Sequence, residues 1–213
     1  MKKFFYATAL IITIIGSLPA QSLSKTSISN ISSAKGWISA YTNIEGSSPS
    51  WKITNTKSNS ISQYIFHLLK TDAHGSEFNL CYTKKITFLN GAISVKFKAN
   101  SGQGDRGGGI AWRVEDNNNY YVVRYNPLED NFCLYYVKNG YRRLLKSATV
   151  ILDKEHWHSM KIVQQGNHYT AYLDSKKILQ GDDTTFTNAG GVGLWTKADA
   201  LTSFKDLKIK KEK

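Results

Sequence analysis

Short apolar runs alternate with polar turn segments along the chain from residue 36 onward. Their spacing of about 8–12 residues is typical of a β-sandwich or barrel. Within residues 92–99, Ile93, Val95 and Phe97 alternate with polar side chains, as expected of a strand with one buried face. Residues 61–69 leave a choice, because their apolar positions fit either a helical stripe or a strand. With no helix of convincing length, repeat or linker, the pattern predicts one all-β domain, an antiparallel two-sheet β-sandwich.

The centre of the chain predicts a meander of four strands, at residues 109–115, 120–126, 132–138 and 141–146. Asn139-Gly140 between the last two is a strong hairpin signal, because both residues tolerate the positive φ that a two-residue turn requires. Further strands are expected on either side of the meander, at residues 51–55, 78–83, 92–99, 157–164, 168–173, 176–180, 191–196 and 204–209.

The N-terminus carries the features of a secretory signal peptide. Lys2 and Lys3 form a basic segment, residues 4–15 are apolar, and residues 20–22 supply small side chains around a cleavage point. The apolar run is too short for a comfortable membrane span, and no later run approaches the length of one. We therefore expect the protein to be exported and to be periplasmic or secreted.

The expected division of the chain follows from this. Residues 1–22 would be the signal peptide, residues 23–35 a flexible leader rich in Ser and Thr, and residues 36–213 the β-sandwich domain.

Composition narrows the function classes. Hydrophobic residues make up 41% of the chain and aromatic residues 12%, which is enough to build a core and excludes wholesale disorder. Lys and Arg number 28 against 16 Asp and Glu, a formal net charge of +12, or +10 without residues 1–22. The charge is dispersed apart from the lysine-rich segment 205–213. For an exported protein this favours anionic polysaccharide or envelope lipid over nucleic acid as a partner.

Two cysteines, Cys81 and Cys133, would enter an oxidising compartment and could pair. Both lie in apolar, strand-like runs, where buried free cysteines are also common. The two alternatives stay open at this point. The spacing of Cys and His matches no zinc motif.

Strand alternation assigns the side chains of the central strands to two faces. If Glu115 pairs with Tyr120 across the turn, one face is apolar and belongs to the core between the sheets: Ile110, Trp112, Val114, Tyr121, Val123 and Tyr125. Tyr135 and Leu194 are expected in the core as well. The other face then collects Arg113, Glu115, Tyr120 and Arg124. Because two unpaired guanidinium groups cannot be buried, this face must meet water or a ligand. It is either a solvated face with a cross-strand Glu–Arg pair or a concave face that grips sugar hydroxyls.

The sequence offers little support for catalysis. Glycoside hydrolysis needs two carboxylates about 5–9 Å apart, yet Glu115 and Asp116 are adjacent and no E-x-D stands on a clear strand. A serine-nucleophile motif G-x-S-x-G is also missing. Glu115 or Asp199 alone could act as a general base. The G-x-G-x-x-G frame within residues 102–109 leads into a strand rather than a helix, so we expect a flexible loop and no phosphate site.

Several segments carry a family resemblance, at residues 108–113, 118–124, 128–131, 138–140, 155–158 and 191–199. Together they resemble bacterial exported domains of the concanavalin A-like lectin/glucanase superfamily, in the set labelled laminin-G-like or related to family-16 glycoside hydrolases and 3-keto-disaccharide hydrolases. The resemblance spans about residues 36–209 and implies a concanavalin A-like jelly roll with a sugar-binding concave face. The chain lacks the E-x-D-x-x-E strand of the true glucanases.

The resemblance also raises the question of calcium, since lectin-like sandwiches often hold a structural Ca²⁺. Carboxylates that could supply oxygen ligands are available, although none has an EF-hand spacing: Asp116, Asp182, Asp183 and Asp206. No other cofactor is expected.

These observations predict a monomeric, exported, non-catalytic glycan-binding module. The predicted ligand-binding residues lie on the concave sheet face: Arg113, Glu115, Tyr120, Arg124, Asn126, Trp195, Lys197 and Asp199. One alternative is an enzyme, a hydrolase or lyase acting on a sugar or 3-keto sugar, with Glu115 or Asp199 as general base. A second alternative is a structural envelope protein that binds another protein.

Overall fold

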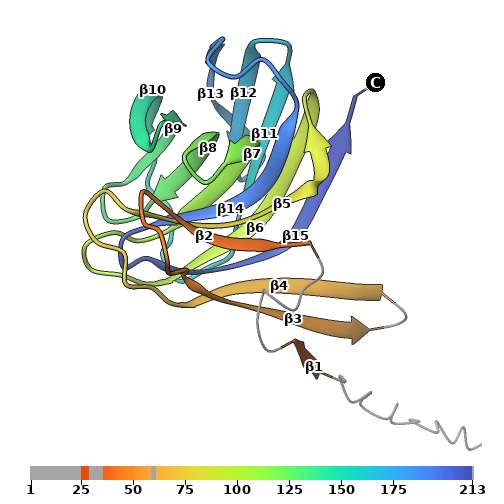
Figure 1. The fold of residues 1–213 in the computed structure, drawn as a ribbon, viewed down its shortest axis with the longest axis vertical. Coiled ribbons are helices and arrows are strands. Elements are labelled where there is room, and N and C mark those ends of the chain that lie inside the picture. Colours follow the sequence, from red (N-terminus) through yellow and green to blue (C-terminus); the bar gives the residue numbers. More distant parts are fainter. Residues whose placement is uncertain (1–24, 29–35, 59–60, 213) are drawn as a thin grey trace, which may run out of the picture.

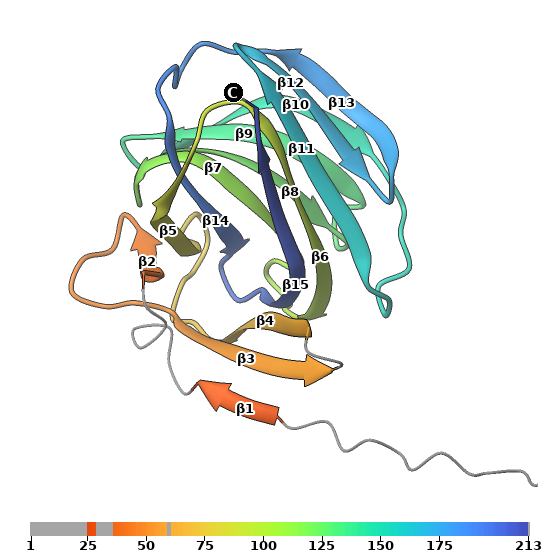
Figure 2. The same cartoon turned by 90° about the vertical axis from the view of Figure 1, so that its right-hand side faces the viewer.

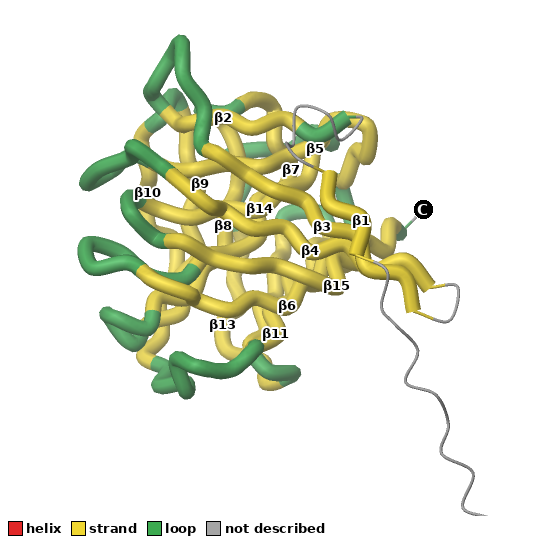
Figure 3. Tube along the Cα trace, turned by 90° about the horizontal axis from the view of Figure 1, so that it is seen from below, coloured by secondary structure: helices red, strands yellow, loops and turns green. Residues whose placement is uncertain are grey.

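A computed structural model describes residues 25–28, 36–58 and 61–212. The predicted signal peptide, residues 1–22, lies outside the described residues, as does most of the predicted leader. Within that leader, Lys25–Ile28 forms strand β1 and pairs with β3. The described residues contain strands and loops but no helix, which confirms the all-β prediction (Figure 3). It follows that no helix in this part of the chain could cross a membrane.

The strands form two antiparallel sheets that pack face to face (Figures 1 and 2). The eight-stranded sheet has the order β1-β3-β4-β15-β6-β11-β12-β13, with strands Lys25–Ile28, Ser50–Ser58, Ile61–Lys70, Leu201–Lys211, Gly91–Ser101, His158–Gln165, His168–Leu173 and Lys176–Asp182. The seven-stranded sheet has the order β10-β9-β8-β7-β14-β5-β2, with strands Tyr141–Thr149, Asn131–Lys138, Asn119–Asn126, Gly108–Asp116, Gly190–Lys197, Phe78–Phe88 and Ile38–Thr42. This is the predicted two-sheet β-sandwich.

Most predicted strands are present at nearly the predicted positions. The ambiguous segment 61–69 is strand β4, which pairs with β3 on one side and β15 on the other. Asn139 and Gly140 both have positive φ, 52° and 78°, and join β9 to β10 in the predicted two-residue turn. Strand β2 was not predicted, because Ile38–Thr42 alternates little and contains a single aliphatic side chain larger than alanine.

The core between the sheets is built mainly of aromatic and branched aliphatic side chains. It contains Trp112, Tyr121, Val123 and Leu194, all predicted core residues and each no more than 2% exposed. Tyr135, also predicted for this core, packs on the opposite face of the seven-stranded sheet instead, because its neighbour Leu134 takes the core side of β9. The rings of Trp112 and Tyr121 stack with centroids 5.3 Å apart, and the Trp112 Nε1–H donates to Gln164 Oε1 at 3.0 Å. The buried polar end of the indole is therefore hydrogen-bonded inside the core.

The opposite face of the seven-stranded sheet carries a second buried cluster. We call this side the concave face, because the sheet curls so that the segments flanking its two edge strands contact each other at one corner. Asn43, which follows edge strand β2, donates from Nδ2 to the Gly140 carbonyl beside the other edge strand, β10, at 2.9 Å. Thr42 in turn donates to the Asn117 carbonyl at 2.8 Å. In Figure 1 the β9–β10 end of the sheet curls at the upper left of the molecule.

The two cysteines face opposite sides of the seven-stranded sheet. Cys81 belongs to the core between the sheets, whereas Cys133 belongs to the cluster on the concave face. Both thiols are buried and unpaired. The sheet itself separates them, so the pairing alternative does not hold in this fold.

Candidate functional site on the concave face

A register shift in β7 changes the predicted faces. Trp112 pairs with Tyr121 and Asp116 with Asn119, so the three β7 residues between them stand opposite Tyr120 alone. Arg113, within this bulge, has a φ of 47°. The predicted pairing of Glu115 with Tyr120 is therefore wrong, because a bulge turns the strand and re-aims its side chains.

The bulge removes Arg113 from the predicted site. Its side chain reaches the sandwich end instead and donates to the carbonyls of Leu89, Phe186 and Gly166, with the shortest distances 2.9, 2.6 and 2.7 Å. Arg113 is 1% exposed, and burial lowers the pKa of its guanidinium. The prediction that it shares an open face with Arg124 is wrong. Val114, predicted for the core between the sheets, packs on the concave face.

Tyr120 and Trp195 do lie on the concave face, but within its buried cluster. The Trp195 Nε1–H donates to the Tyr120 hydroxyl at 3.2 Å, and that hydroxyl also lies 2.8 Å from Thr42 Oγ1. Tyr120 is fully buried and Trp195 is 1% exposed. These rings therefore cannot serve as open platforms for a sugar, because the rolled edge of the sheet covers them.

Arg124 is the centre of the polar part of this face. From the middle of β8 its guanidinium donates to Glu129 Oε2 at 2.8 Å, to the Tyr135 hydroxyl at 3.1 Å, and to Asn131 Oδ1. Asn131 also donates to Glu129 at 3.0 Å. Arg124 is 3% exposed, while the Glu129 side chain is 46% exposed. The network thus runs from the buried face to solvent.

A second set of polar side chains adjoins Arg124. Asp105 accepts from Asn126 Nδ2 at 3.2 Å, and its other carboxylate oxygen lies 3.0 Å from Lys197 Nζ. Asp105 was not among the predicted site residues, because it lies in a glycine-rich loop whose sequence shows nothing of its burial. With Arg124, Glu129 and Asn131 these residues form what we call the Arg124 cluster: Asp105, Arg124, Asn126, Glu129, Asn131, Tyr135 and Lys197.

The two carboxyl groups of the Arg124 cluster differ in their electrostatics. Burial raises the pKa of Asp105, against the opposing effect of Lys197. Burial also acts on Glu129, but the hydrogen bonds from Arg124 and Asn131 bring the pKa of its carboxyl below the ordinary value. The face therefore holds one carboxyl group that protonates more readily than usual and one that stays ionised.

Arg142 is a second arginine on this face that sequence reasoning missed. Its guanidinium carbon lies 4.3 Å from the centre of the Tyr135 ring, 5.2 Å from that of Phe78 and 5.9 Å from that of Trp195. Burial lowers the pKa of Arg142. The signal was available, since the Asn-Gly turn pairs Arg142 with Val137 and so assigns it to the same face as Tyr135.

Asp199 has a structural position next to the cluster. Its carboxylate accepts the backbone N–H groups of Gln103, Gly104 and Asp105 at 2.7 to 3.1 Å. The loop at residues 102–107, expected to be flexible, is therefore held, and Thr202 adds a 2.6 Å bond to the Gly107 carbonyl. This is how Asp105 comes to be buried beside Asn126.

Glu115 lies away from the Arg124 cluster. It is exposed and is the penultimate residue of β7, whereas Asp199 contacts the loop that precedes this strand. At about 3.3 Å per residue the strand separates them by about 20 Å, too far for a carboxylate pair. The structure thus brings together four of the predicted residues, Arg124, Asn126, Lys197 and Asp199, and leaves Glu115 and Arg113 apart.

The described residues contain no group of three His, Cys, Asp or Glu side chains arranged to hold a metal ion. All four suggested calcium ligands have other partners: Asp116 accepts from Asn119, Asp182 lies 3.0 Å from His168, Asp183 accepts from Tyr121, and Asp206 lies 3.0 Å from Lys96 Nζ. Calcium binding stays a prediction.

Comparison with known proteins agrees with this architecture. The model of one family, described as the 3-keto-alpha-glucoside-1,2-lyase-like domain, matches residues 25–210. No curated protein matches the chain significantly. Among solved structures, the carbohydrate-binding module CBM66 from Bacillus subtilis is 17% identical with a TM-score of 0.59, over 74% of this chain and 92% of that one.

Two further structures share the fold. A Bacillus subtilis protein of unknown function with a galectin-like fold is 12% identical with a TM-score of 0.56, over 88% of this chain and 94% of that one. The GH16 protein of the Bacteroides ovatus mixed-linkage glucan PUL, in complex with the G4G4G3G product, is 14% identical with a TM-score of 0.54, over 88% of this chain and 99% of that one. These similarities confirm the predicted concanavalin A-like jelly roll.

Proposed function

Because the chain belongs to the 3-keto-alpha-glucoside-1,2-lyase-like domain family, we propose that it is an exported domain that binds a glycan without cleaving it. Family membership makes it a sugar-related β-sandwich domain. The proposal adds the place of binding, which is the solvent-facing side of the Arg124 cluster, and the absence of catalysis.

The observation that carries the proposal is a pair of buried N–H donors that have no hydrogen-bond partner. Arg124 Nε and Arg142 Nη1 are buried and have no hydrogen-bond partner among the described residues. An unsatisfied buried donor costs about 1–3 kcal/mol, so each would gain a hydrogen bond if a sugar hydroxyl entered the cluster from its exposed Glu129 side. Glu129 and Asn131, at the exposed side of the cluster, add acceptors for hydroxyl protons. Donors and acceptors side by side suit a sugar, whose hydroxyls do both.

The nearby carboxylates already have hydrogen-bond or ion-pair partners, which argues against catalysis. Glu129 is bound to Arg124, Asp105 to Lys197, and Asp199 to backbone N–H groups. A general base for glycoside chemistry needs a free carboxylate that reaches a water or a hydroxyl. Each of these groups would first have to leave its partner.

Neutral glycans give the direct test, with two neighbouring arginines as a matched pair. We expect a neutral oligosaccharide selected on a glycan array to bind Arg142→Leu about 10- to 100-fold more weakly, the loss of one or two bonds from a charged donor. Arg143→Leu should bind it like the wild type, because Arg143 alternates to the other side of β10. Melting temperatures of both variants check the fold.

Two results would overturn the proposal. One is that no neutral glycan binds the folded wild-type protein. The other is that the two leucine variants lose affinity equally, which would show that general charge, rather than Arg142 against Tyr135 of the Arg124 cluster, holds the sugar.

An enzyme is the second candidate, favoured by the opposite pKa shifts of Asp105 and Glu129. Paired carboxyl groups with diverging pKa values are the usual arrangement for an acid and a base. In this case a 3-keto-glucoside would be consumed by the wild-type protein and not by Asp105→Asn, with product followed by mass spectrometry. Absence of turnover, with binding retained, would leave the binding proposal alone.

A further inference from the structure

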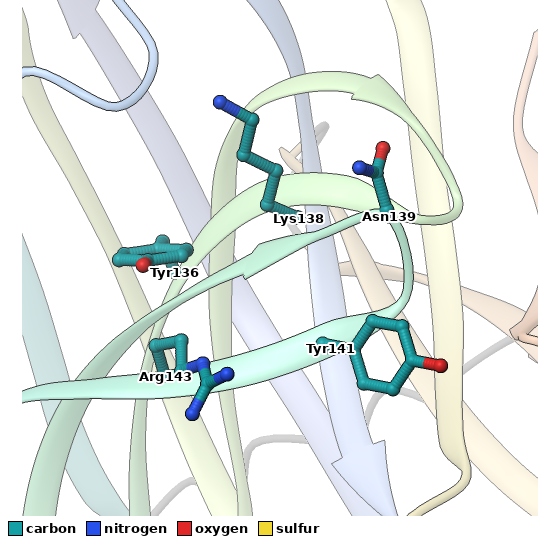
Figure 4. A pocket seen from close by; sticks show the side chains of 5 residues that line it. All are labelled: Tyr136, Lys138, Asn139, Tyr141 and Arg143. Atoms are coloured by element: carbon teal, nitrogen blue, oxygen red, sulfur yellow. The ribbon is translucent and has the colours of Figure 1, made fainter.

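The β9–β10 hairpin has a second face, turned away from the Arg124 cluster. Alternation sends Tyr135 and Arg142 to the concave face, so Tyr136 and Arg143 point the other way. Tyr136 pairs with Arg143 across the two strands, and Lys138 pairs with Tyr141. These four side chains therefore form a two-by-two group of neighbours (Figure 4).

A hollow of about 260 Å³ lies on this face of the hairpin. Its lining is Tyr136, Lys138, Asn139, Tyr141 and Arg143, and we call it the hairpin pocket. Tyr141 is 72% exposed, Lys138 and Arg143 are exposed, and Tyr136 is half-buried. The rings are thus accessible, in contrast to Tyr120 and Trp195 on the concave face.

The polar side chains of the hairpin pocket have no partner within the described part of the protein. Among the described residues, none of its five side chains takes part in a hydrogen bond or an ion pair. Asn139 is held only through its backbone N–H, which donates to Asn119 Oδ1 at 2.9 Å. The turn is therefore fixed while the amide, the two phenols and the two cations stay available to a ligand.

The charges define the ligand. Two cations and no carboxylate line the pocket, so an anion is favoured and a basic ligand is not. An arginine fork matches the two oxygens of a carboxylate or sulfate. A tyrosine ring offers a flat apolar surface with a polar tip, suited to the C–H face of a sugar ring. We propose that the hairpin pocket binds an anionic sugar unit, with its acidic group on Arg143 and Lys138 and its ring against Tyr141.

This site is independent of the proposed function. It uses the opposite side of the hairpin and a charged rather than a neutral ligand, so either proposal can fail while the other stands.

Titration calorimetry with a tetragalacturonate and its fully methyl-esterified form tests the proposal, since the two differ in charge. We expect the acid to bind and the ester to bind at least about tenfold more weakly. A sulfated oligosaccharide of similar length distinguishes the source of the anion. Binding of either acidic oligosaccharide supports the shared chemistry and tells carboxylate from sulfate.

Substitutions within and outside the hairpin pocket test where the acidic sugar binds. Arg143→Ala and Tyr141→Ala should each weaken binding of the acidic sugar about tenfold. Lys146→Ala, which removes one exposed charge from the same strand outside the pocket, should change it less than about twofold once salt screens long-range attraction. Arg142→Leu should also leave it unchanged.

The proposal is overturned if neither acidic oligosaccharide binds the folded protein, or if acid and ester bind equally. It is also overturned if Lys146→Ala weakens binding as much as Arg143→Ala, because attraction to the basic surface as a whole would then explain the affinity.

Discussion

Replacing Arg113 by alanine tests whether this arginine is structural or ligand-binding. Its guanidinium joins three segments at one end of the sandwich, through the carbonyls of Leu89, Gly166 and Phe186. Alanine would occupy the same position in the bulge with the same positive φ, so the backbone strain is unchanged. The difference between the two proteins then reports the side chain alone.

The expected loss of folding free energy is large. A hydrogen bond to a charged group contributes about 1.5–3 kcal/mol, and we take the low end because most of these contacts are only partly buried. Three carbonyls that lose their donor then amount to about 4.5 kcal/mol. At about 2–4 °C per kcal/mol for a domain of this size, the melting temperature should fall by about 9–18 °C.

Thermal and urea unfolding followed by circular dichroism measure this change. Arg143→Ala, an exposed arginine with no such contacts, should shift the free energy of unfolding by less than about 0.5 kcal/mol. Arg113→Gly should recover about 1 kcal/mol relative to alanine, because glycine adopts the positive φ without strain. A loss below about 1 kcal/mol in Arg113→Ala would refute the structural role argued from these bonds.

Three further predictions concern other parts of the chain. Burial acts to raise the pKa of Asp199, but the N–H groups of residues 103–105 lower it below the ordinary value. The ionised carboxylate therefore stabilises the fold at pH values above the ordinary carboxyl pKa of about 4. This stabilisation is lost as the pH falls. Asp199→Asn should be less stable near neutral pH and should approach the wild type toward pH 3 in urea unfolding; a pH-independent gap would contradict this. Cys81 and Cys133 should react with Ellman's reagent only after unfolding, since both are buried and burial raises the pKa of the Cys81 thiol; reaction in the folded protein, or a disulfide found by mass spectrometry, would count against it. We also propose export with loss of residues 1–22, so the intact mass of exported protein should begin at Leu23, and a retained Met1 would argue against this.

Local pattern predicted the elements well, because each strand is specified by its own residues. Alternation of apolar and polar side chains identified β6 without reference to any partner, and Asn139-Gly140 identified the turn of the β9–β10 hairpin. Prediction of the site failed where one strand depends on another. The residues around Arg113 contain no pattern that predicts a bulge. A register shift there is enough to change the direction in which the Arg113 side chain points.

The rolling of the sheet was equally hidden from the sequence. It depends on contacts such as that between Asn43 and Gly140, which lie 97 residues apart. Tyr120 and Trp195 were correctly assigned to one face, yet whether that face is open depends on these distant contacts. Asp105 was missed for the same reason, since its burial depends on the hydrogen bonds between the N–H groups of its loop and the Asp199 carboxylate.

The position of β10 at the border of the seven-stranded sheet has a consequence for how the protein behaves in concentrated solution. A border strand exposes backbone groups that another chain could extend, which is a common start of aggregation. In β10 the pairing shifts between Leu144 and Lys146, and the strand carries Arg142, Arg143 and Lys146 around this irregularity. A second copy would meet a bent strand of like charge, so we expect this edge to resist edge-to-edge joining.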